Sequence, residues 1–121
     1  TGVHRLGAPV SLGKSLTVAN EMLAAHDLAQ SIHLEEGSGI SRDNHFTARG
    51  LAKVLGLFAP HANLLKRGKG AAYKTGTLDG VRTLAGYADT SRHGKVRFVI
   101  SLKGNDSELR FRLLRAIQAA L

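Results

Sequence analysis

The sequence predicts an α+β domain in which helices come first, followed by three antiparallel strands and a C-terminal helix. Apolar residues recur at helical spacing in the first half of the chain, whereas apolar and polar residues alternate through much of the stretch from 71 to 102. With 121 residues, of which 43% are hydrophobic, the chain has the material of one domain with a real core. Wholesale disorder is therefore not expected.

The first half of the chain is expected to be mainly helical. Residues 1–13 read as an irregular entry, and residues 14–66 as a helical part with a Gly-Ser loop at 37–44. A helix is predicted from about Ser15 to Ala29, and a short strand or extended stretch follows at Ile32. The expected N-cap of a second helix is Thr47, and the expected start of a further helical turn is Pro60. The predicted apolar faces of the two helices are Leu16, Ala19, Met22, Leu23 and Leu28, and then Leu51, Val54, Leu55 and Phe58.

The second half, residues 70–121, is expected to hold the sheet and the terminal helix. Strands are predicted at residues 71–75, 81–87 and 96–102, with a turn at 91–94. Short connections between consecutive strands indicate an antiparallel meander. Either Asn105 or Asp106 is expected to cap the last helix, whose predicted stripe toward the sheet is Leu109, Leu113, Ile117 and Leu121.

Composition and charge exclude several kinds of site. The chain has 17 Lys and Arg residues against 9 Asp and Glu, a formal net charge of +8 that attracts anions. Aromatic residues are only 5% and the basic residues are dispersed, so no specific nucleic-acid site is expected. The absence of cysteine excludes disulfides, thiolate zinc sites and a cysteine nucleophile. No apolar run approaches the ~20 residues of a membrane span, and no signal peptide is visible. The threonine start suggests a processed or trimmed piece.

The local feature with the most specific chemistry is Lys74-Thr75-Gly76 on a predicted strand. A lysine on an edge strand places a cation beside a cleft, a threonine hydroxyl binds a carboxylate, and glycine lets a ligand lie against the backbone. The next backbone N–H, that of Thr77, can point at a developing oxyanion. The alternative for the tripeptide alone is an ordinary strand with a lysine at its edge.

Two longer stretches carry a resemblance to a known family. The first runs from Tyr73 to Tyr87 and reads YKTGTLDGVRTLAGY, and the second covers residues 37–44, GSGISRDN, and continues into TARGL at 47–51. They resemble the K-T-G region and the D-G-S-G-L-S-R-x-N segment of the serine-type D-alanyl-D-alanine carboxypeptidase/endopeptidase family, the class C penicillin-binding proteins. The resemblance covers roughly residues 35–121. It implies the C-terminal part of a penicillin-binding-protein/β-lactamase-like transpeptidase fold, with a sheet between helices.

The other catalytic motifs of that family, S-x-x-K and S-x-N, are not securely present. No S-x-N occurs, and where the family would carry one the chain reads Ser15-Leu16-Thr17. The one S-x-x-K match is Ser11 with Lys14, which a helix would place on one face as nucleophile and base. The alternative is a chance spacing, because serines and lysines are frequent here, Gly13 weakens a helix, and the family places its nucleophile far upstream.

Other polar residues are expected to have structural roles. The six histidines lack metal-ligand spacing and are interpreted as solvated surface residues. Glu36 stands where the family has aspartate, and Arg42 is a candidate anchor of the Gly-Ser loop. The serines Ser38 and Ser41 are expected to shape that loop rather than to act as nucleophiles.

The resemblance implies part of a serine carboxypeptidase that acts on D-Ala-D-Ala stem peptides of peptidoglycan and is acylated by β-lactams, in the periplasm or cell envelope. Lys74 and Thr75 would receive the substrate carboxylate, with Ser15 as a weaker candidate, and the N–H of Thr77 would join the oxyanion hole. No metal or organic cofactor is implied. The rest of a parent chain or a homodimer partner is expected to cover the open edge of the sheet. The alternative function is a non-catalytic envelope or polyanion-binding module that keeps the fold without the nucleophile.

Overall fold

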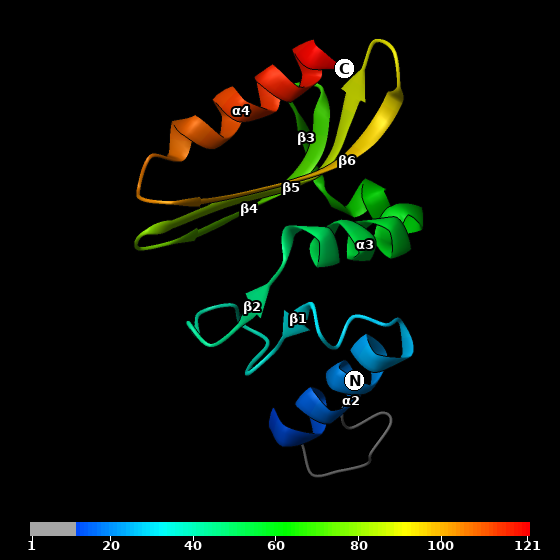
Figure 1. Cartoon of the computed structure of the whole chain (residues 1–121), viewed down its shortest axis with the longest axis vertical. Helices are drawn as coiled ribbons and strands as arrows, with labels where there is room; N and C mark the ends of the chain where they lie inside the picture. The colour runs from blue at the N-terminus through cyan, green and yellow to red at the C-terminus, as the bar shows by residue number, and fades with distance from the viewer. Residues whose placement is uncertain (1–11) are drawn as a thin grey trace. The chain divides into compact units, whose positions relative to one another are not determined.

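The computed structural model describes residues 12–121 (Figure 1). These residues divide between Gly50 and Leu51 into two compact units, each with its own internal packing. Helices precede an antiparallel sheet that is followed by a last helix, which confirms the predicted α+β class. None of the helices within 12–121 combines the length and the apolar character that crossing a bilayer requires.

The first unit begins with α2, Leu12–Ala25. The helix was expected from Ser15 to Ala29; it starts earlier, and it ends earlier because Asp27 has a positive φ of 61°, which takes the chain out of the helix. The Leu28 N–H then donates to the Leu23 carbonyl, and the Leu28 side chain is buried. Met22, placed on the apolar face by its spacing, is 53% exposed, whereas Val18 is 1% exposed. The buried face of α2 is therefore rotated from the predicted one.

A small antiparallel pair completes this unit. Strand β1, Ile32–His33, pairs with β2, His45–Phe46, so that Ile32 lies opposite Phe46. The predicted short strand at Ile32 is confirmed. The eleven-residue stretch from 34 to 44 between the strands contains the Gly-Ser loop.

Helix α3, Ala48–Phe58, begins in the first unit and continues into the second. Its predicted N-cap is confirmed, because the Thr47 hydroxyl oxygen accepts a hydrogen bond from the Gly50 N–H at 3.0 Å. A 3₁₀ helix, η1, follows at Ala59–Leu64 with Pro60 in its first turn, as expected.

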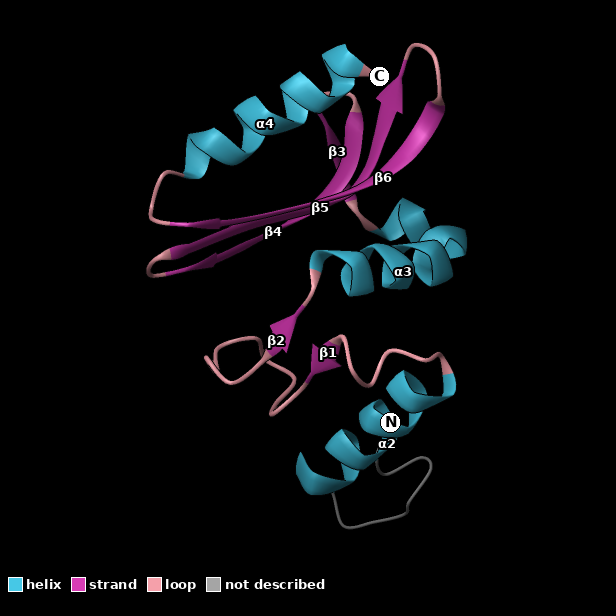
Figure 2. Ribbon diagram, in the orientation of Figure 1, coloured by secondary structure: helices cyan, strands magenta, loops and turns pink. Residues whose placement is uncertain are grey.

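Within the described residues the larger sheet has four strands in the order β3-β4-β5-β6, all antiparallel (Figure 2). Their bounds are β3, Lys66–Gly68; β4, Ala71–Leu78; β5, Val81–Thr90; and β6, Gly94–Lys103. The prediction of three strands missed β3, which lies in the densest basic run of the sequence. The turn from β3 to β4 has positive φ at both central residues, Lys69 (53°) and Gly70 (69°), the pattern of a tight hairpin.

Helix α4, Ser107–Ala120, covers one face of the sheet (Figure 2). Asp106 is its N-cap, since its carboxylate accepts from the N–H groups of Glu108 and Leu109 at 3.0 and 3.1 Å. The stripe that faces the sheet differs from the predicted one, because Leu113 is 36% exposed while Arg110 and Leu114 are buried. The core on this face consists of Ala71, Tyr73, Leu84, Ala88, Phe98, Ile100 and Leu114.

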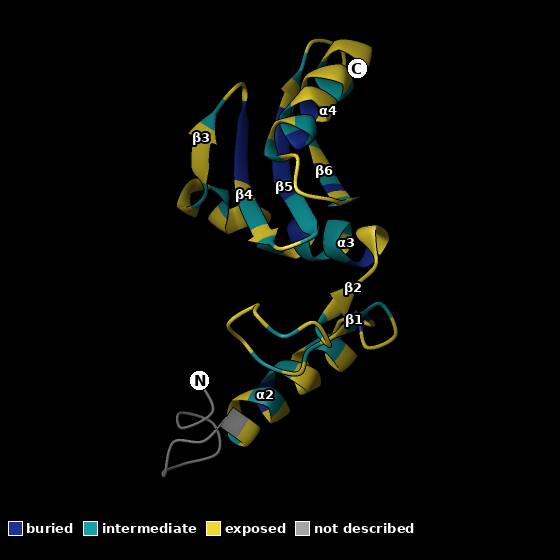
Figure 3. Cartoon of the chain, turned by 90° about the vertical axis from the view of Figure 1, so that its left-hand side faces the viewer, coloured by how far each residue is buried: buried dark blue, intermediate teal, exposed yellow. Residues whose placement is uncertain are grey.

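The opposite face packs on the second-unit part of α3 and on η1. Leu55, Ala72 and Tyr87 form its buried centre, and the Tyr87 hydroxyl donates to the Leu55 carbonyl. Burial raises the pKa of that hydroxyl above its usual range, and the positive charge of Arg97 opposes the rise. Figure 3 shows the buried stretches concentrated in β4 and β5, the central strands. The middle of the sheet is therefore covered on both faces.

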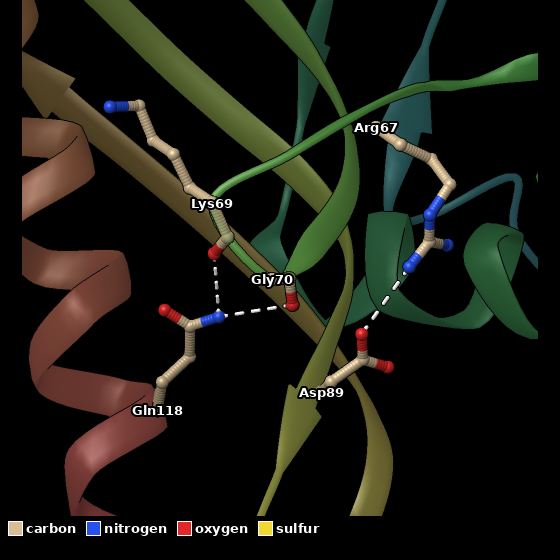
Figure 4. A network of polar contacts seen from close by, with 5 residues as sticks. All are labelled: Arg67, Lys69, Gly70, Asp89 and Gln118. Atoms are coloured by element: carbon tan, nitrogen blue, oxygen red, sulfur yellow. Dashed lines mark hydrogen bonds and ion pairs between the residues drawn. The ribbon is translucent and has the colours of Figure 1, made fainter.

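A polar network ties the β3–β4 hairpin to its surroundings (Figure 4). The Gln118 side-chain amide of α4 donates to the carbonyls of Lys69 and Gly70, at 3.0 Å in both cases. Arg67 and Asp89 form an ion pair at 3.3 Å, but both side chains are more than half exposed. Such exposed pairs contribute little to stability, so Gln118 is the more effective tie.

Candidate functional site

The Lys74-Thr75-Gly76 motif lies on an open edge of the sheet. Strand β3 pairs with β4 only at residues 71–73, so β4 has no neighbour on that side from Lys74 onward within the described residues. The Asp89 N–H donates to the Gly70 carbonyl, which shows which β4 residues form their backbone hydrogen bonds with β5. Because this alternates along an antiparallel strand, the even-numbered residues of β4 bond to β5. The N–H and C=O groups of Thr75 and Thr77 therefore point to the open edge. A ligand backbone or an oxyanion can reach these groups directly.

The Lys74 side chain is exposed at this edge. Its ammonium donates to the Thr75 carbonyl at 2.8 Å. Successive side chains on a strand point to opposite faces, so Lys74 shares a face with Ala72 and Gly76, whereas Thr75 shares the face of Tyr73 and Thr77. Because the Lys74 and Thr75 side chains lie on opposite faces of the sheet, a single ligand can contact both of them only if it binds along the open edge of β4.

Gly76 is required by its cross-strand neighbour. It lies opposite Thr83 on β5, and a Cβ at position 76 would lie 2.2 Å from the Thr83 hydroxyl oxygen. Any other residue would displace Thr83 or the strand.

Two arginines lie behind the edge without a carboxylate partner among the described residues. Arg110, on α4, is 7% exposed and donates to the Gly76 carbonyl at 3.1 Å, the Thr77 hydroxyl oxygen at 3.2 Å and the Thr83 carbonyl at 3.3 Å. Arg82, on β5, donates to the carbonyls of Leu78 and Val81 at 2.6 and 2.9 Å and to the Ser107 hydroxyl oxygen at 2.9 Å. Together with Lys74 they make this edge electropositive.

Sequence reasoning missed Arg110. The predicted stripe of α4 placed this residue toward solvent, although a helical spacing that includes Leu114 and Ile117 brings Arg110 to the sheet. The only signal in the sequence was the spacing of Arg110 from Leu114 and Ile117, which puts the three on one helix face. This signal is weak, because arginine usually lies at the surface.

The Gly-Ser loop is organised around the Glu36 carboxylate. It accepts hydrogen bonds from the N–H and hydroxyl of Ser38, from the Ser41 N–H at 2.9 Å and from the Asn44 side-chain amide at 2.8 Å. These bonds, the one from the Ser38 side chain above all, lower the pKa of Glu36 from 4.5 to about 2. The carboxylate is therefore charged at neutral pH, as the aspartate it replaces would be.

The rest of the loop confirms the structural roles of its serines. The Asn44 amide oxygen accepts from the N–H groups of Glu35 and Glu36 at 2.7 and 3.2 Å. The Ser41 hydroxyl donates to the Glu35 carboxylate at 2.8 Å. Arg42, the candidate anchor, is exposed and has no hydrogen-bond or ion-pair partner within 12–121. The anchors are instead Glu36 and Asn44.

The weaker candidates belong to the start of the chain. Ser11 lies outside the described residues, while Lys14 and Ser15 lie on α2, half-buried and exposed respectively. Thr17, the last residue of the predicted Ser15-Leu16-Thr17 counterpart of S-x-N, donates its hydroxyl to the Gly13 carbonyl one turn earlier, at 2.9 Å. The Thr17 hydroxyl thus satisfies a helix carbonyl. The roles of Ser11, Lys14 and Ser15 stay predictions.

Within residues 12–121 no group of three or more His, Cys, Asp or Glu side chains could hold a metal ion. The nearest approach is the cross-strand pair His33 and His45, whose ring centroids are 5.4 Å apart on the exposed β1–β2 pair. Two exposed imidazoles do not complete a coordination shell.

The strands and the last helix carry a similarity to a known family. Residues 66–119, less than half of the chain, match the D-Ala-D-Ala carboxypeptidase 3 (S13) family. They contain the whole four-stranded sheet, the K-T-G motif and nearly all of α4. No curated protein matches the chain in sequence.

Two solved structures share the fold. Penicillin binding protein 4 (dacB) from Haemophilus influenzae, complexed with a novel β-lactam, matches with a TM-score of 0.76 and 21% identity, over 97% of this chain and 36% of that one. A predatory endopeptidase from Bdellovibrio bacteriovorus, in complex with an immunity protein, matches with a TM-score of 0.59 and 22% identity, over 98% of this chain and 37% of that one. The chain spans little more than a third of the length of these proteins.

Proposed function

We propose that this chain is the C-terminal part of a serine D-Ala-D-Ala carboxypeptidase or endopeptidase that acts on peptidoglycan stem peptides. The observation that carries the proposal is the K-T-G motif on the unpaired edge of β4, inside the residues that match the carboxypeptidase family. An enzyme of this class needs a cation, a hydroxyl and a free backbone N–H in one row. Lys74, Thr75 and Thr77 supply them in this order along β4, with Gly76 between the two threonines.

The substrate's terminal carboxylate is received by Lys74 and Thr75. The ammonium leaves the Thr75 carbonyl, which it contacts at 2.8 Å, and forms a charge-assisted hydrogen bond with the carboxylate. Arg82 and Arg110 add positive potential from behind the strand. An extended peptide end along β4 meets the outward N–H and C=O groups of Thr75 and Thr77 as an added strand would.

The N–H of Thr77 forms part of the oxyanion hole. When a serine attacks the scissile carbonyl, the carbonyl oxygen becomes negatively charged and is stabilised by this fixed donor. The C–N bond then breaks, the leaving D-alanine takes a proton, and water hydrolyses the acyl-serine. A β-lactam follows the same first step, but its leaving group stays attached after ring opening.

The attacking serine is proposed to lie in the rest of the protein, because the relatives in structure are nearly three times as long as this chain. Ser11 with Lys14 is the candidate within the chain. An enzyme that cleaves peptidoglycan works outside the cytoplasmic membrane, so the proposed location is the periplasm or cell envelope.

Labelling with a fluorescent penicillin tests this proposal. The full-length protein should form a covalent band that an excess of D-Ala-D-Ala peptide suppresses, whereas residues 1–121 alone should form none. A band on residues 1–121 that disappears in Ser11→Ala would move the nucleophile into this chain. Full-length protein that neither labels nor cleaves the peptide would refute the proposed activity.

The alternative is a module that binds envelope polyanions without chemistry. The net charge of +8 and the absence of any S-x-N sequence favour it. It predicts binding to anionic cell-wall polymer that weakens steeply with salt, without acylation. The labelling experiment separates the two functions, because only the enzyme acquires the covalent label.

A further inference from the structure

Arg110 is a buried cation for which the family match gives no role. Its side chain comes from the first turns of α4 and reaches the K-T-G strand at three oxygen atoms, the carbonyls of Gly76 and Thr83 and the hydroxyl of Thr77. It is 7% exposed, and its Nε has no hydrogen-bond partner within the described residues. A buried charge normally has a carboxylate partner, and this one has none among residues 12–121.

Fold stability alone does not call for an arginine here, although the guanidinium carbon also lies 5.5 Å from the centroid of the Phe111 ring. Gly76 and Thr83 form a hydrogen-bonded pair of the β4–β5 ladder, so both carbonyls already have a backbone donor without Arg110. Burying a guanidinium against neutral oxygens costs desolvation free energy, and the unpaired Nε adds to that cost. An apolar side chain of similar volume would fill the same space without this penalty.

Arg110 also contacts the Thr77 hydroxyl, a contact that a residue with a purely structural role would not need. The Thr77 side chain and its backbone N–H belong to one short edge segment that pairs with β5 on one side and has no strand on its outer side within the described residues. An unpaired edge is free to twist, and a twist would turn the N–H away from an oxyanion. Arg110 fixes this segment at the Gly76 carbonyl and at the Thr77 hydroxyl, on either side of that N–H.

We propose that Arg110 is a positioning residue for the oxyanion hole, which it holds by fixing the Gly76–Thr77 edge from behind. The proposal rests on the proposed function, because it assigns Arg110 to the acylation step of that enzyme. Arg110 does not touch the substrate. Its loss therefore affects the acylation step and leaves the first, non-covalent binding step intact.

The proposal is tested by measuring how the rate of acylation of the full-length protein saturates with the concentration of a chromogenic β-lactam. This measurement separates the non-covalent dissociation constant from the acylation rate constant. Arg110→Gln should lower the acylation rate constant roughly ten- to a hundred-fold, as expected for a misplaced oxyanion donor, and leave the dissociation constant within about threefold. Arg112→Gln, the same change on the exposed side of α4, should alter neither.

Thr77→Val keeps the backbone N–H and the shape but removes the oxygen that Arg110 contacts. It should also lower the acylation rate constant, and its effect should not add to that of Arg110→Gln, because both remove one contact. Arg110→Lys keeps the charge, but its side chain is shorter and its ammonium does not reach the place of Nη1, the nitrogen that makes all three contacts, so it should recover only part of the rate. Thr77→Val tests the contact even if Arg110 variants fold poorly.

The outcomes separate this inference from the proposed function. If Lys74→Ala impairs acylation while Arg110→Gln and Thr77→Val acylate at the parental rate constant, the Arg110 inference alone is wrong. It is also wrong if Arg110→Gln loses binding and acylation together, in step with a lower melting temperature. If the full-length protein is not acylated at all, the proposed function fails and the inference fails with it.

Discussion

The Thr83 hydroxyl oxygen lies 2.2 Å from the position that a Cβ on Gly76 would take. The two residues face each other across β4 and β5, so packing inside the sheet requires a glycine at this position of K-T-G. Substitutions at both positions test this packing requirement.

Gly76→Ala in the full-length protein should lower the free energy of unfolding by about 1–3 kcal/mol, because the new methyl group overpacks the pair. Thr83→Ala removes the hydroxyl and should relieve most of this loss, since the Thr83 Cβ lies 3.6 Å from the added atom. Thr83→Val is the matched control, which keeps the volume and should give no relief. Thermal melts of the single and double variants measure the difference, and equal losses in all three backgrounds would contradict the packing account.

Asp106→Ala should destabilise α4 by about 1 kcal/mol, because two N–H groups of the first turn lose their acceptor. Asp106→Asn should retain most of the stability, since asparagine is an equally good N-cap. Chemical denaturation of both variants provides the comparison. If Asp106→Ala left the free energy of unfolding unchanged, the cap would contribute nothing to stability.

The Glu36 carboxylate predicts a pH-dependent loop. Its pKa is lowered from 4.5 to about 2, so its contribution to stability is fully present above pH 4.5 and is lost as the pH falls from 4.5 through about 2. The amide resonances of Ser38 and Ser41, whose N–H groups donate to it, should shift with a midpoint near pH 2. Glu36→Gln should abolish this transition and Asp43→Asn, in the same loop, should not. A midpoint near 4.5 would show that the carboxylate is not held as described.

Residues 1–121 produced alone should associate. Strand β6 pairs only with β5 within the described residues, and its ten residues leave a long edge open. Several large apolar side chains are also exposed, among them Ile40 at 71% and Leu64 at 73%. Sedimentation should therefore show a dimer or a small oligomer at micromolar concentration. A stable, well-folded monomer would count against the chain being part of a larger protein.

The parts of the fold that local chemistry determines could be predicted from the sequence. Thr47 and Asp106 are caps because a short side-chain oxygen before an apolar helix satisfies the free N–H groups of its first turn. Strand β6 alternates between apolar and polar residues regularly enough to be recognised, whereas the burial along β4 does not alternate. The lysine, threonine and glycine were nevertheless predicted on a strand, where the structure has them.

What escaped prediction depends on partners distant in sequence. Lys69 adopts a positive φ that glycine or asparagine would normally provide, so Gly70 alone of the two central residues of the β3–β4 hairpin was a turn signal. The predicted stripe of α4 took every fourth residue, but an α-helix has 3.6 residues per turn, so such a stripe rotates around the helix. The prediction therefore placed Leu113 toward the sheet and Arg110 toward solvent, whereas Leu113 is exposed and Arg110 is buried. Arg110 is buried because carbonyls of the folded sheet accept its hydrogen bonds, and the sequence alone does not contain those carbonyls' positions.

The most direct test of the central claim compares acylation of the full-length protein by a penicillin and by its neutral methyl ester. Lys74 is exposed, and its one hydrogen bond is to the adjacent Thr75 carbonyl, so Lys74→Ala should leave the melting temperature unchanged. Losing a charge-assisted contact typically costs ~1.5–3 kcal/mol, which at about 1.4 kcal/mol per decade is roughly a ten- to hundred-fold fall in second-order acylation by the acid. The ester, which lacks the carboxylate, should lose far less, and Lys74→Arg should recover only part of the rate. Parental acylation of Lys74→Ala by the acid, or a loss that is equal for acid and ester, would contradict the assignment of Lys74 to the substrate carboxylate.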